Sequence, residues 1–314
     1  YLMSKKILIT GGAGYIGSML ATKLVNLGHN VTVLDSLKFS SSSLNHLFRF
    51  ENFNLIFGDV RNKKLINQEL KKNEYIIPLA ALVGAPLCEK NKNEAISVNL
   101  KSIEFLMKNM KPRNKIIYLT TNSGYGVGEK NKFCDEKSPL NPISLYGRTK
   151  VDAEKIVMKY KNSIGFRLAT VFGFSHRMRS DLLVNNFVLT AIKEKKLKIF
   201  EPKFRRNYIH VNDVVDGIIY SINNFALLKS NVYNLGLSSA NLTKLMLANK
   251  IKKQLKFLKI KIIKNKKDPD QRDYFVSNKK IEKKGFKAKI SIEKGIKELI
   301  NVFTYSKDKI TNNY

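Results

Sequence analysis

Tyr146 and Lys150 have the spacing of a proton-transfer pair, because they lie four positions apart in the run Tyr-Gly-Arg-Thr-Lys. On a helix, residues four apart lie on one face. A lysine ammonium beside a phenol favours the phenolate and lowers a pKa that is ordinarily about 10. Such a phenolate can take the proton of an alcohol while the alcohol carbon loses a hydride. The pair therefore indicates alcohol oxidation, although the same spacing also occurs by chance on ordinary helix surfaces.

A glycine-rich segment near the start of the chain predicts what would accept the hydride. Gly11, Gly14 and Gly17 form a GxxGxxG pattern between an apolar run at 6–10 and a helical pattern at 14–27. Glycines here permit a tight turn and let the backbone approach a pyrophosphate closely. The free N–H groups at the start of the helix also attract phosphate. The segment therefore predicts a dinucleotide-binding turn.

Two acidic residues at the ends of predicted strands indicate which dinucleotide binds. Asp35 lies 18 residues after Gly17 and follows the apolar run at 30–34. A carboxylate at this place binds the adenosine ribose hydroxyls. Because it would repel a 2′-phosphate, we expect NAD rather than NADP. Asp59 follows the run at 54–57 and is expected within reach of the adenine amino group, unless it only caps a turn.

The elements that must position these residues alternate between strand and helix patterns. Apolar runs typical of buried parallel strands occur at 6–10, 30–34, 54–57, 75–79, 115–119 and 162–168. Helical patterns lie between them, for example at 93–110. This alternation predicts an α/β fold, a Rossmann-type doubly wound parallel sheet with a smaller C-terminal substrate-binding lobe. Residues 1–168 are expected to form the NAD-binding domain, with a return near 205–225, and residues 169–314 the interleaved lobe.

The later part of the chain is less regular. Its patterns predict short strands at 198–200 and 232–235, and helices at 181–195, 211–224 and 243–255. The sequence shows no internal repeat and no long linker between these elements.

Composition limits the classes of protein to consider. The 314 residues carry a formal net charge of +32 and are 43% hydrophobic. The lysines are spread along the whole chain, which indicates a compositional bias rather than a nucleic-acid-binding stripe. No apolar run approaches the ~20 residues that cross a bilayer. Two cysteines and four scattered histidines predict no disulfide framework and no metal site. We expect a cytoplasmic enzyme that binds neither membrane nor nucleic acid.

Further stretches follow in an order that resembles the extended short-chain dehydrogenase/reductase family of nucleotide-sugar epimerases, dehydratases and dehydrogenases. They are TGGAGYIG at 10–17, LD at 34–35, GDVRN at 58–62, LAA at 79–81, VNL at 98–100, LTTNSGYG at 119–126, SLYGRTKVDAE at 144–154, RNYIHVNDV at 206–214 and NLG at 234–236. The resemblance covers nearly the whole chain. It is highly specific for the family and much less so for the reaction.

The resemblance implies roles for individual residues. The family has a catalytic Ser or Thr four residues before the Tyr of a YG dipeptide, here Thr121 before Tyr125-Gly126. Thr121, Tyr146 and Lys150 are thus the expected catalytic residues. Lys150 should also contact the nicotinamide ribose, and Asn99 should lie nearby in a structural role. The expected NAD-binding residues are Gly11, Gly14, Tyr15, Ile16, Gly17, Asp35, Asp59, Val60, Leu79, Ala80, Ala81, Asn99, Tyr146 and Lys150.

The resemblance also implies a nucleotide-diphosphate sugar as substrate. A basic residue before the YIHV-like motif matches Arg206, and a second, in the segment 268–273, matches Arg272; both suit a diphosphate. The run Arg177-Met178-Arg179 could also hold phosphates. The expected substrate-binding residues are Val83, Thr121, Asn122, Ser123, Tyr146, Asn185, Arg206 and Arg272.

Two departures from the family pattern bear on the reaction. The 4,6-dehydratases place an Asp-Glu pair after the catalytic Thr, where this chain has Asn122 and Ser123. Neither side chain is a competent acid or base near neutral pH, which disfavours dehydration. Thr170 stands where members often carry an Asn, so that substrate contact does not carry over.

The runs at 77–88 and 121–129 resemble bacterial polysaccharide-pathway members, such as those of capsule synthesis. This resemblance implies oxidation at C4 of a GDP-sugar, such as GDP-heptose, to the 4-keto sugar. A 4-epimerase is the alternative. A 4,6-dehydratase and a non-catalytic nucleotide-binding regulator are less favoured. We expect a homodimer or a higher homo-oligomer.

Overall fold

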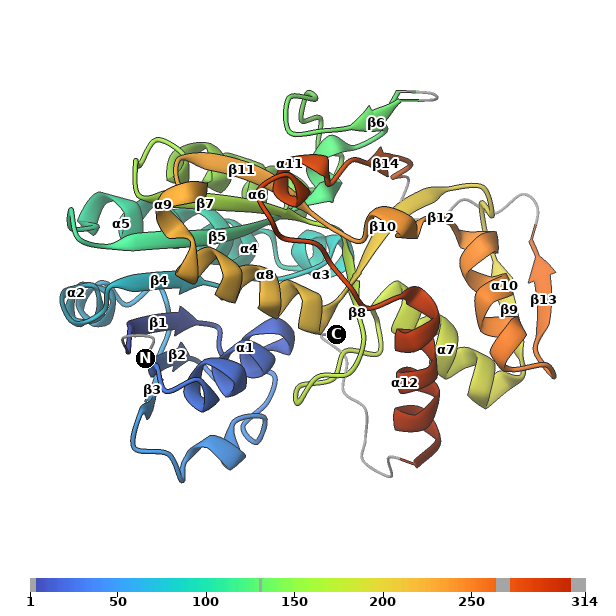
Figure 1. Ribbon diagram of the computed structural model, residues 1–314, viewed down its shortest axis with the longest axis horizontal. Helices are drawn as coiled ribbons and strands as arrows, with labels where there is room; N and C mark the ends of the chain where they lie inside the picture. The colour runs from blue at the N-terminus through green and yellow to red at the C-terminus, as the bar shows by residue number, and fades with distance from the viewer. Residues whose placement is uncertain (1–3, 130–131, 264–271, 306–314) are drawn as a thin grey trace.

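A seven-stranded parallel sheet forms the centre of the molecule. The structure is a computed structural model that describes residues 4–129, 132–263 and 272–305 (Figure 1). Every neighbouring pair in the sheet is parallel. In spatial order the strands are β11 (Asn231–Leu235), β7 (Ser163–Leu168), β5 (Lys115–Thr121), β4 (Tyr75–Pro78), β1 (Lys6–Thr10), β2 (Asn30–Asp35) and β3 (Phe53–Phe57). The predicted α/β fold with a doubly wound sheet is confirmed.

Helices cover both faces of this sheet because its central strands are apolar on both sides. Ile7 and Ile9 of β1 belong to one buried cluster, whereas Leu8 belongs to another. The first cluster is covered by α1 (Tyr15–Asn26), α8 (Val211–Asn223), α9 (Phe225–Leu228) and α11 (Lys279–Glu282). The second is covered by α2 (Lys63–Lys72), α3 (Ala85–Lys90), α4 (Lys92–Ile96), α5 (Ser102–Asn109) and α6 (Leu145–Val157). Side chains that alternate along each strand therefore feed two separate cores.

A smaller lobe lies to one side of the sheet, where Figure 1 shows α7, α10 and α12 grouped together. Its elements are β8 (Thr170–Phe172), α7 (Leu183–Glu194), β9 (Lys196–Ile199), β10 (Arg205–His210), β12 (Asn241–Thr243), α10 (Lys244–Gln254), β13 (Lys259–Ile262) and α12 (Ile292–Tyr305). Strands β12, β10 and β8 form one small sheet, and β13 pairs with β9. A third buried cluster, separate from the other two, holds this outer lobe together.

Short elements complete the described chain. β6 (Phe133–Cys134) pairs with β14 (Phe275–Val276). The 3-10 turns are Asn45–Leu47, Asn122–Tyr125 and Ser238–Ala240. A π-helical turn at Ser97–Lys101 interrupts the helix expected at 93–110. None of the helices in the described ranges has the length and apolarity needed to cross a membrane.

The chain returns to the main sheet after entering the outer lobe. α8 packs against α1, close to the expected return near 205–225. The strand expected at 232–235 is β11, which pairs with β7 at the edge of the main sheet rather than joining the lobe. β10 belongs instead to the small sheet. The boundary at 168/169 remains a prediction. The three strands of the small sheet all follow residue 168, whereas the main sheet also takes β11 from the later part of the chain.

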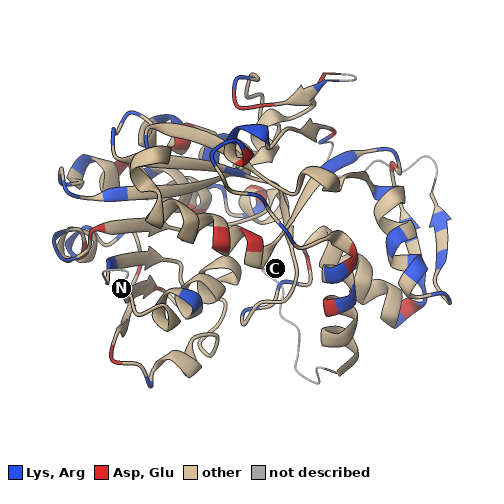
Figure 2. Ribbon diagram, in the orientation of Figure 1, with Lys and Arg blue, Asp and Glu red and all other residues tan. Residues whose placement is uncertain are grey.

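The basic residues do not gather in one place. Figure 2 shows Lys and Arg on most elements of both parts, with several on α10 and β13. This distribution agrees with the compositional bias expected from the sequence.

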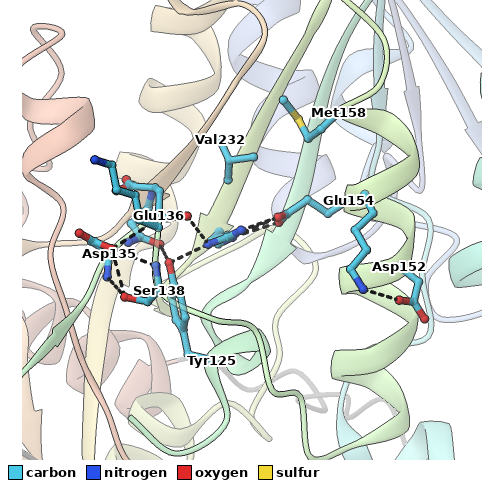
Figure 3. A network of polar contacts seen from close by, with 12 residues as sticks. Tyr125, Asp135, Glu136, Ser138, Asp152, Glu154, Met158 and Val232 are labelled. Carbon is cyan, nitrogen blue, oxygen red and sulfur yellow. Dashed lines mark hydrogen bonds and ion pairs between the residues drawn. The ribbon is translucent and has the colours of Figure 1, made fainter. Parts of the chain in front are cut away.

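A buried ion pair connects the sheet to the helix that carries Tyr146 and Lys150. Arg167 of β7 and Glu154 of α6 are both almost fully buried, and the Nη2 atom of Arg167 lies 2.8 Å from Oε1 of Glu154. Nη1 of Arg167 also donates to the Tyr125 hydroxyl at 3.1 Å. That hydroxyl donates at 2.7 Å to Oδ1 of Asn234 in β11. Figure 3 shows Glu154 and Tyr125 entering this network from different elements. The network thus locks α6 to β7, β11 and the turn after β5.

Removing the carboxylate of Glu154 should leave the Arg167 guanidinium buried without its counter-charge. Glu154→Gln is expected to lower the free energy of unfolding by about 3–5 kcal/mol, as for other broken buried ion pairs. Asp152→Asn is the matched control, because Asp152 and Lys155 of the same helix form an exposed pair. For that variant a loss of about 0–1 kcal/mol is expected. Urea unfolding followed by circular dichroism measures both, and equal losses would contradict the special place of Glu154.

Candidate functional site

A cavity of about 970 Å³ opens at the carboxyl ends of the main strands and extends to the outer lobe. This edge is where the strand order reverses between β1 and β4, the usual ligand crevice of an open α/β sheet. Thirteen of the fourteen residues expected to bind NAD line it: Gly11, Gly14, Tyr15, Ile16, Gly17, Asp35, Asp59, Val60, Leu79, Ala80, Ala81, Tyr146 and Lys150. Thr121, Val83, Ser123, Arg206 and Arg272 line it as well.

The glycine turn after β1 leaves no space for side chains. A Cβ on Gly11 would lie 2.5 Å from the backbone nitrogen of Ala80, and one on Gly17 would lie 2.5 Å from the Gly11 oxygen. Gly11 also has a φ of +72°, which L side chains rarely adopt. α1 begins directly afterwards, with Gly14 as a cap that offers no side chain to the first N–H groups. The turn therefore fits a dinucleotide pyrophosphate, as the sequence predicted.

Asp35 is held rigidly at the edge of this cradle. The Ala13 N–H donates to its Oδ2 at 2.9 Å, and the Leu37 N–H donates to its Oδ1 at 2.8 Å. Burial raises the pKa of the carboxyl above its ordinary value, and the two N–H donors oppose that rise. Each oxygen keeps a further lone pair for a ribose hydroxyl.

Asp59 also faces the cavity, but its carboxylate is already engaged. Arg61 donates to Oδ1 from Nε at 2.9 Å and to Oδ2 from Nη2 at 2.6 Å. These bonds lower the pKa of Asp59. Arg61 therefore competes for the carboxylate with the adenine contact expected of Asp59, and that contact remains a prediction.

Thr121 and Tyr146 reach the cavity from neighbouring elements. Thr121 ends β5, and its Oγ1 lies 2.8 Å from the Ser123 hydroxyl. Tyr146 stands in the first turn of α6, which begins because the Ser144 hydroxyl accepts the Gly147 N–H at 3.1 Å. The two hydroxyls and the phenol thus face the cavity beside the glycine cradle.

The electrostatics of Tyr146 and Lys150 differ from the expectation. Burial raises the pKa of Tyr146 to about 12, which Arg179 opposes, Cys88 reinforces and Arg272 opposes. Burial lowers the pKa of Lys150 to about 7, against the opposing charge of Glu154. The Lys150 Nζ lies 4.3 Å from the ring centroid of Tyr118. In the protein without its ligands, burial therefore dominates the pKa of Tyr146, which rises instead of falling as predicted.

Basic side chains from the outer lobe converge on the other end of the cavity. They are Arg177, Arg179, Arg206, Lys244 and Arg272. Of these, Arg177, Arg206 and Lys244 are nearly fully buried. Lys244 starts α10 and was missed by the sequence analysis, because nothing local distinguishes it among 57 basic residues. Within the described ranges, no three His, Cys, Asp or Glu side chains gather as metal ligands do. This end of the cavity suits an anionic group.

Three expected residues do not line the cavity. Asn99 is buried and holds Leu82, accepting its N–H at 2.8 Å and donating to its carbonyl at 2.9 Å, which suits a structural role. Asn122 is buried, and its side chain has no hydrogen-bond partner among the described residues. Asn185 accepts the Gly173 N–H at 3.1 Å and donates to the Arg179 carbonyl at 2.8 Å.

The asparagine that does line the cavity is Asn186. One step along a helix turns the side chain by about 100°, so an error of one residue moves an amide from the core to the cavity. Thr170, where family members often carry an Asn, also lines it. Asn185 was expected from the family resemblance, and the structure places the adjacent Asn186 at the cavity instead.

Comparison with known proteins agrees with this geometry. A model of the NAD dependent epimerase/dehydratase family matches residues 7–236. A dTDP-D-glucose 4,6-dehydratase of Dictyostelium discoideum is 29% identical over 75% of this chain. A putative UDP-glucose 4-epimerase of Methanocaldococcus jannaschii is 26% identical over 94% of this chain and 97% of that protein. The chain spans about half the length of other curated relatives, 59% of the Dictyostelium protein and 47% of three trifunctional Arabidopsis thaliana enzymes.

Solved structures share the fold. The crystal structure of UDP-glucuronic acid 4-epimerase from Bacillus cereus, in complex with UDP-glucuronic acid and NAD, is 22% identical with a TM-score of 0.83. That likeness covers 95% of this chain and 99% of the Bacillus chain. With the family model matched over most of its length, and the glycine cradle, the tyrosine and the lysine gathered around one cavity, the chain belongs to the NAD dependent epimerase/dehydratase family.

Proposed function

We propose that this chain uses NAD to oxidise C4 of a nucleotide-diphosphate sugar to the 4-keto sugar. The observation that carries the proposal is the composition of one cavity. It joins a pyrophosphate cradle at Gly11, a phenol at Tyr146 and buried cations such as Arg206. A dinucleotide would bind at the cradle, and the diphosphate of a nucleotide sugar would bind at the cations. The sugar alcohol would then lie between them, beside the phenol.

Each residue then has a defined task. The hydroxyls of Thr121 and Ser123 hold the sugar oxygen, and Tyr146 removes its proton. NAD held by the turn at Gly11 would supply the hydride acceptor for C4, and its positive charge would favour the phenolate of Tyr146. Lys150 holds the cofactor ribose, and a pKa of about 7 lets it carry or release a proton near neutral pH. Arg206, Lys244 and Arg272 neutralise the substrate diphosphate.

The alternatives differ in what happens to the keto sugar. A 4-epimerase would hold it, let it turn over and return the hydride to the other face, and the near full-length match to the Methanocaldococcus protein favours this second candidate. Dehydration is less favoured, because Asn122 does not line the cavity and the Ser123 hydroxyl is bonded to Thr121. A GDP-sugar such as GDP-heptose is proposed from the sequence runs at 77–88 and 121–129. Homo-oligomerisation and a cytoplasmic location stay predictions.

Replacing Asp35 tests the cofactor assignment. Asp35→Asn should weaken NAD binding by roughly tenfold or more, since hydrogen bonds to a charged group contribute about 1.5–3 kcal/mol. It should also reduce the preference for NAD over NADP. Asp59→Asn is the matched control and should change NAD affinity less, because Arg61 already engages that carboxylate. Isothermal titration calorimetry measures both, and wild-type protein that prefers NADP would rule out the role of Asp35.

Replacing Tyr146 tests the base. Tyr146→Phe keeps the ring and should slow turnover by at least ~10²-fold, while NAD binding survives. The wild-type rate should rise with pH, because burial raises the pKa of Tyr146 and only its phenolate accepts the proton. Initial rates between neutral and alkaline pH give both results. A Tyr146→Phe protein that turns over at the wild-type rate would refute the mechanism.

Trapping the product decides between oxidation and epimerisation. GDP-, UDP- and dTDP-sugars are incubated with the enzyme and NAD, and half of each sample is treated with borodeuteride. A 4-keto product two mass units lighter than substrate, which borodeuteride labels at C4, is expected from a GDP-sugar. An isobaric C4 epimer without a trapped ketone would overturn net oxidation in favour of epimerisation. Conversion of only UDP- or dTDP-sugars would leave the proposed reaction intact and would refute guanine as the nucleotide base of the substrate.

A further inference from the structure

A segment of the outer lobe lies directly on the first turn of α1, where the glycine cradle ends. This bridging segment comprises residues 173–177, which follow β8. The Tyr15 hydroxyl donates to the Gly173 carbonyl at 2.7 Å, and the Ser175 hydroxyl donates to the Tyr15 carbonyl at 2.6 Å. The Ser175 and Ser18 hydroxyls lie 3.2 Å apart. All of these contacts are buried, so the outer lobe is attached at the phosphate-binding end of α1.

The bridging segment is also attached on its other sides. The ring of His176 lies 4.3 Å, centroid to centroid, from that of His46 in the 3-10 turn that follows β2. The Phe174 N–H donates at 3.0 Å to Glu298 of α12. The segment therefore spans from the outer lobe, over α1, to the loop that follows Asp35.

Arg177 extends from this segment into the cavity with its charge unsatisfied. Its side chain is 3% exposed, and its Nε and Nη2 atoms have no hydrogen-bond partner among the described residues. The guanidinium carbon lies 5.4 Å from the ring centroid of Phe39, in the loop after Asp35. Burial, with help from Arg179, lowers the pKa of Arg177. The nearby acid, Asp181, is bonded to Arg179 instead. A buried cation with two idle donors is costly unless an anion completes it.

We infer that Arg177 clamps the diphosphate of the bound dinucleotide from the outer lobe. The inference rests on the proposed function, because it needs NAD in the glycine cradle. Guanidinium donors match phosphate oxygens in pairs. The turn at Gly11 supplies N–H groups on one side of that diphosphate, and Arg177 supplies the charge on the other. Because the bridging segment belongs to the substrate-binding lobe, cofactor release then requires this segment to part from α1.

The position of Arg177 separates it from the substrate diphosphate. Arg206 and Lys244 enter the cavity from β10 and α10. Arg177 instead packs on Phe39, which lies four residues after Asp35. In the chain, Arg177 comes two residues after Ser175, which donates to the Tyr15 carbonyl. A 2′-phosphate of NADP is disfavoured as the partner by the Asp35 carboxylate beside the ribose position.

Arg177→Leu keeps apolar contact with Phe39 and removes the donors. NAD affinity, measured by calorimetry, should fall about tenfold or more, the effect of losing hydrogen bonds to a charged group. ADP-ribose, which has the same diphosphate, should lose as much affinity, whereas adenosine should lose none. Displacement of bound NADH, followed by its fluorescence, should become faster. Arg177→Lys, which keeps the charge, should recover part of the affinity.

Two controls separate a clamp from a structural residue. Without nucleotide, the melting temperature of Arg177→Leu should equal or exceed that of wild type, because the variant removes a buried charge that lacks a partner. Arg206→Leu should weaken binding of GDP or UDP and leave NAD affinity unchanged.

Several results would overturn the clamp. They are unchanged affinity of Arg177→Leu for NAD and ADP-ribose, an equal loss for adenosine, a loss confined to NADP, or a large fall in melting temperature without nucleotide. Wild-type protein that binds no NAD would instead overturn the proposed function on which the clamp rests.

Discussion

The close approach of two loops at the reversal of the strand order sets the geometry of the whole site. The turn after β1 passes so near the loop after β4 that a single methyl group on Gly11 would collide with the backbone of Ala80. This contact brings the N-terminus of α1 to the same edge of the sheet as the ends of β4 and β5. Thr121 and, through α6, Tyr146 reach the cavity along that edge. A wider separation would divide the phosphate cradle from the catalytic side chains.

Burial is the second constraint, and it disfavours the charged forms of side chains at both ends of the cavity. At the catalytic end it raises the pKa of Tyr146 and lowers that of Lys150, so both groups are less charged than in water. At the lobe end Arg177 and Arg206 are enclosed, and burial lowers the pKa of Arg177. The arginines at the lobe end attract anionic ligands. The Tyr146 phenol needs a positive charge beside it, such as that of a bound cofactor, in order to ionise.

The ion pair of Arg167 with Glu154 attaches the helix that carries Tyr146 and Lys150 to the main sheet. Glu154 stands one turn after Lys150 on α6, and its negative charge opposes the loss of the lysine proton. Through Arg167 and Tyr125 the same helix is bonded to β7 and to Asn234 of β11. One of the residues that hold this helix, Asn234, therefore comes from a strand that returns to the sheet after the chain has entered the outer lobe.

Local patterns in the sequence were enough to predict the sheet, the glycine cradle, Asp35 and the Tyr146–Lys150 pair. Each depends on spacing within one turn or one strand, which the chain specifies over a few residues. Contacts between distant segments could not be predicted in this way. Asn185 was expected in the cavity and Lys244 was overlooked. The net rise in the pKa of Tyr146, which its burial causes, was not predicted. Only the packing of the outer lobe against α1 and the sheet decides which side chains are buried, and burial sets both their partners and their pKa values.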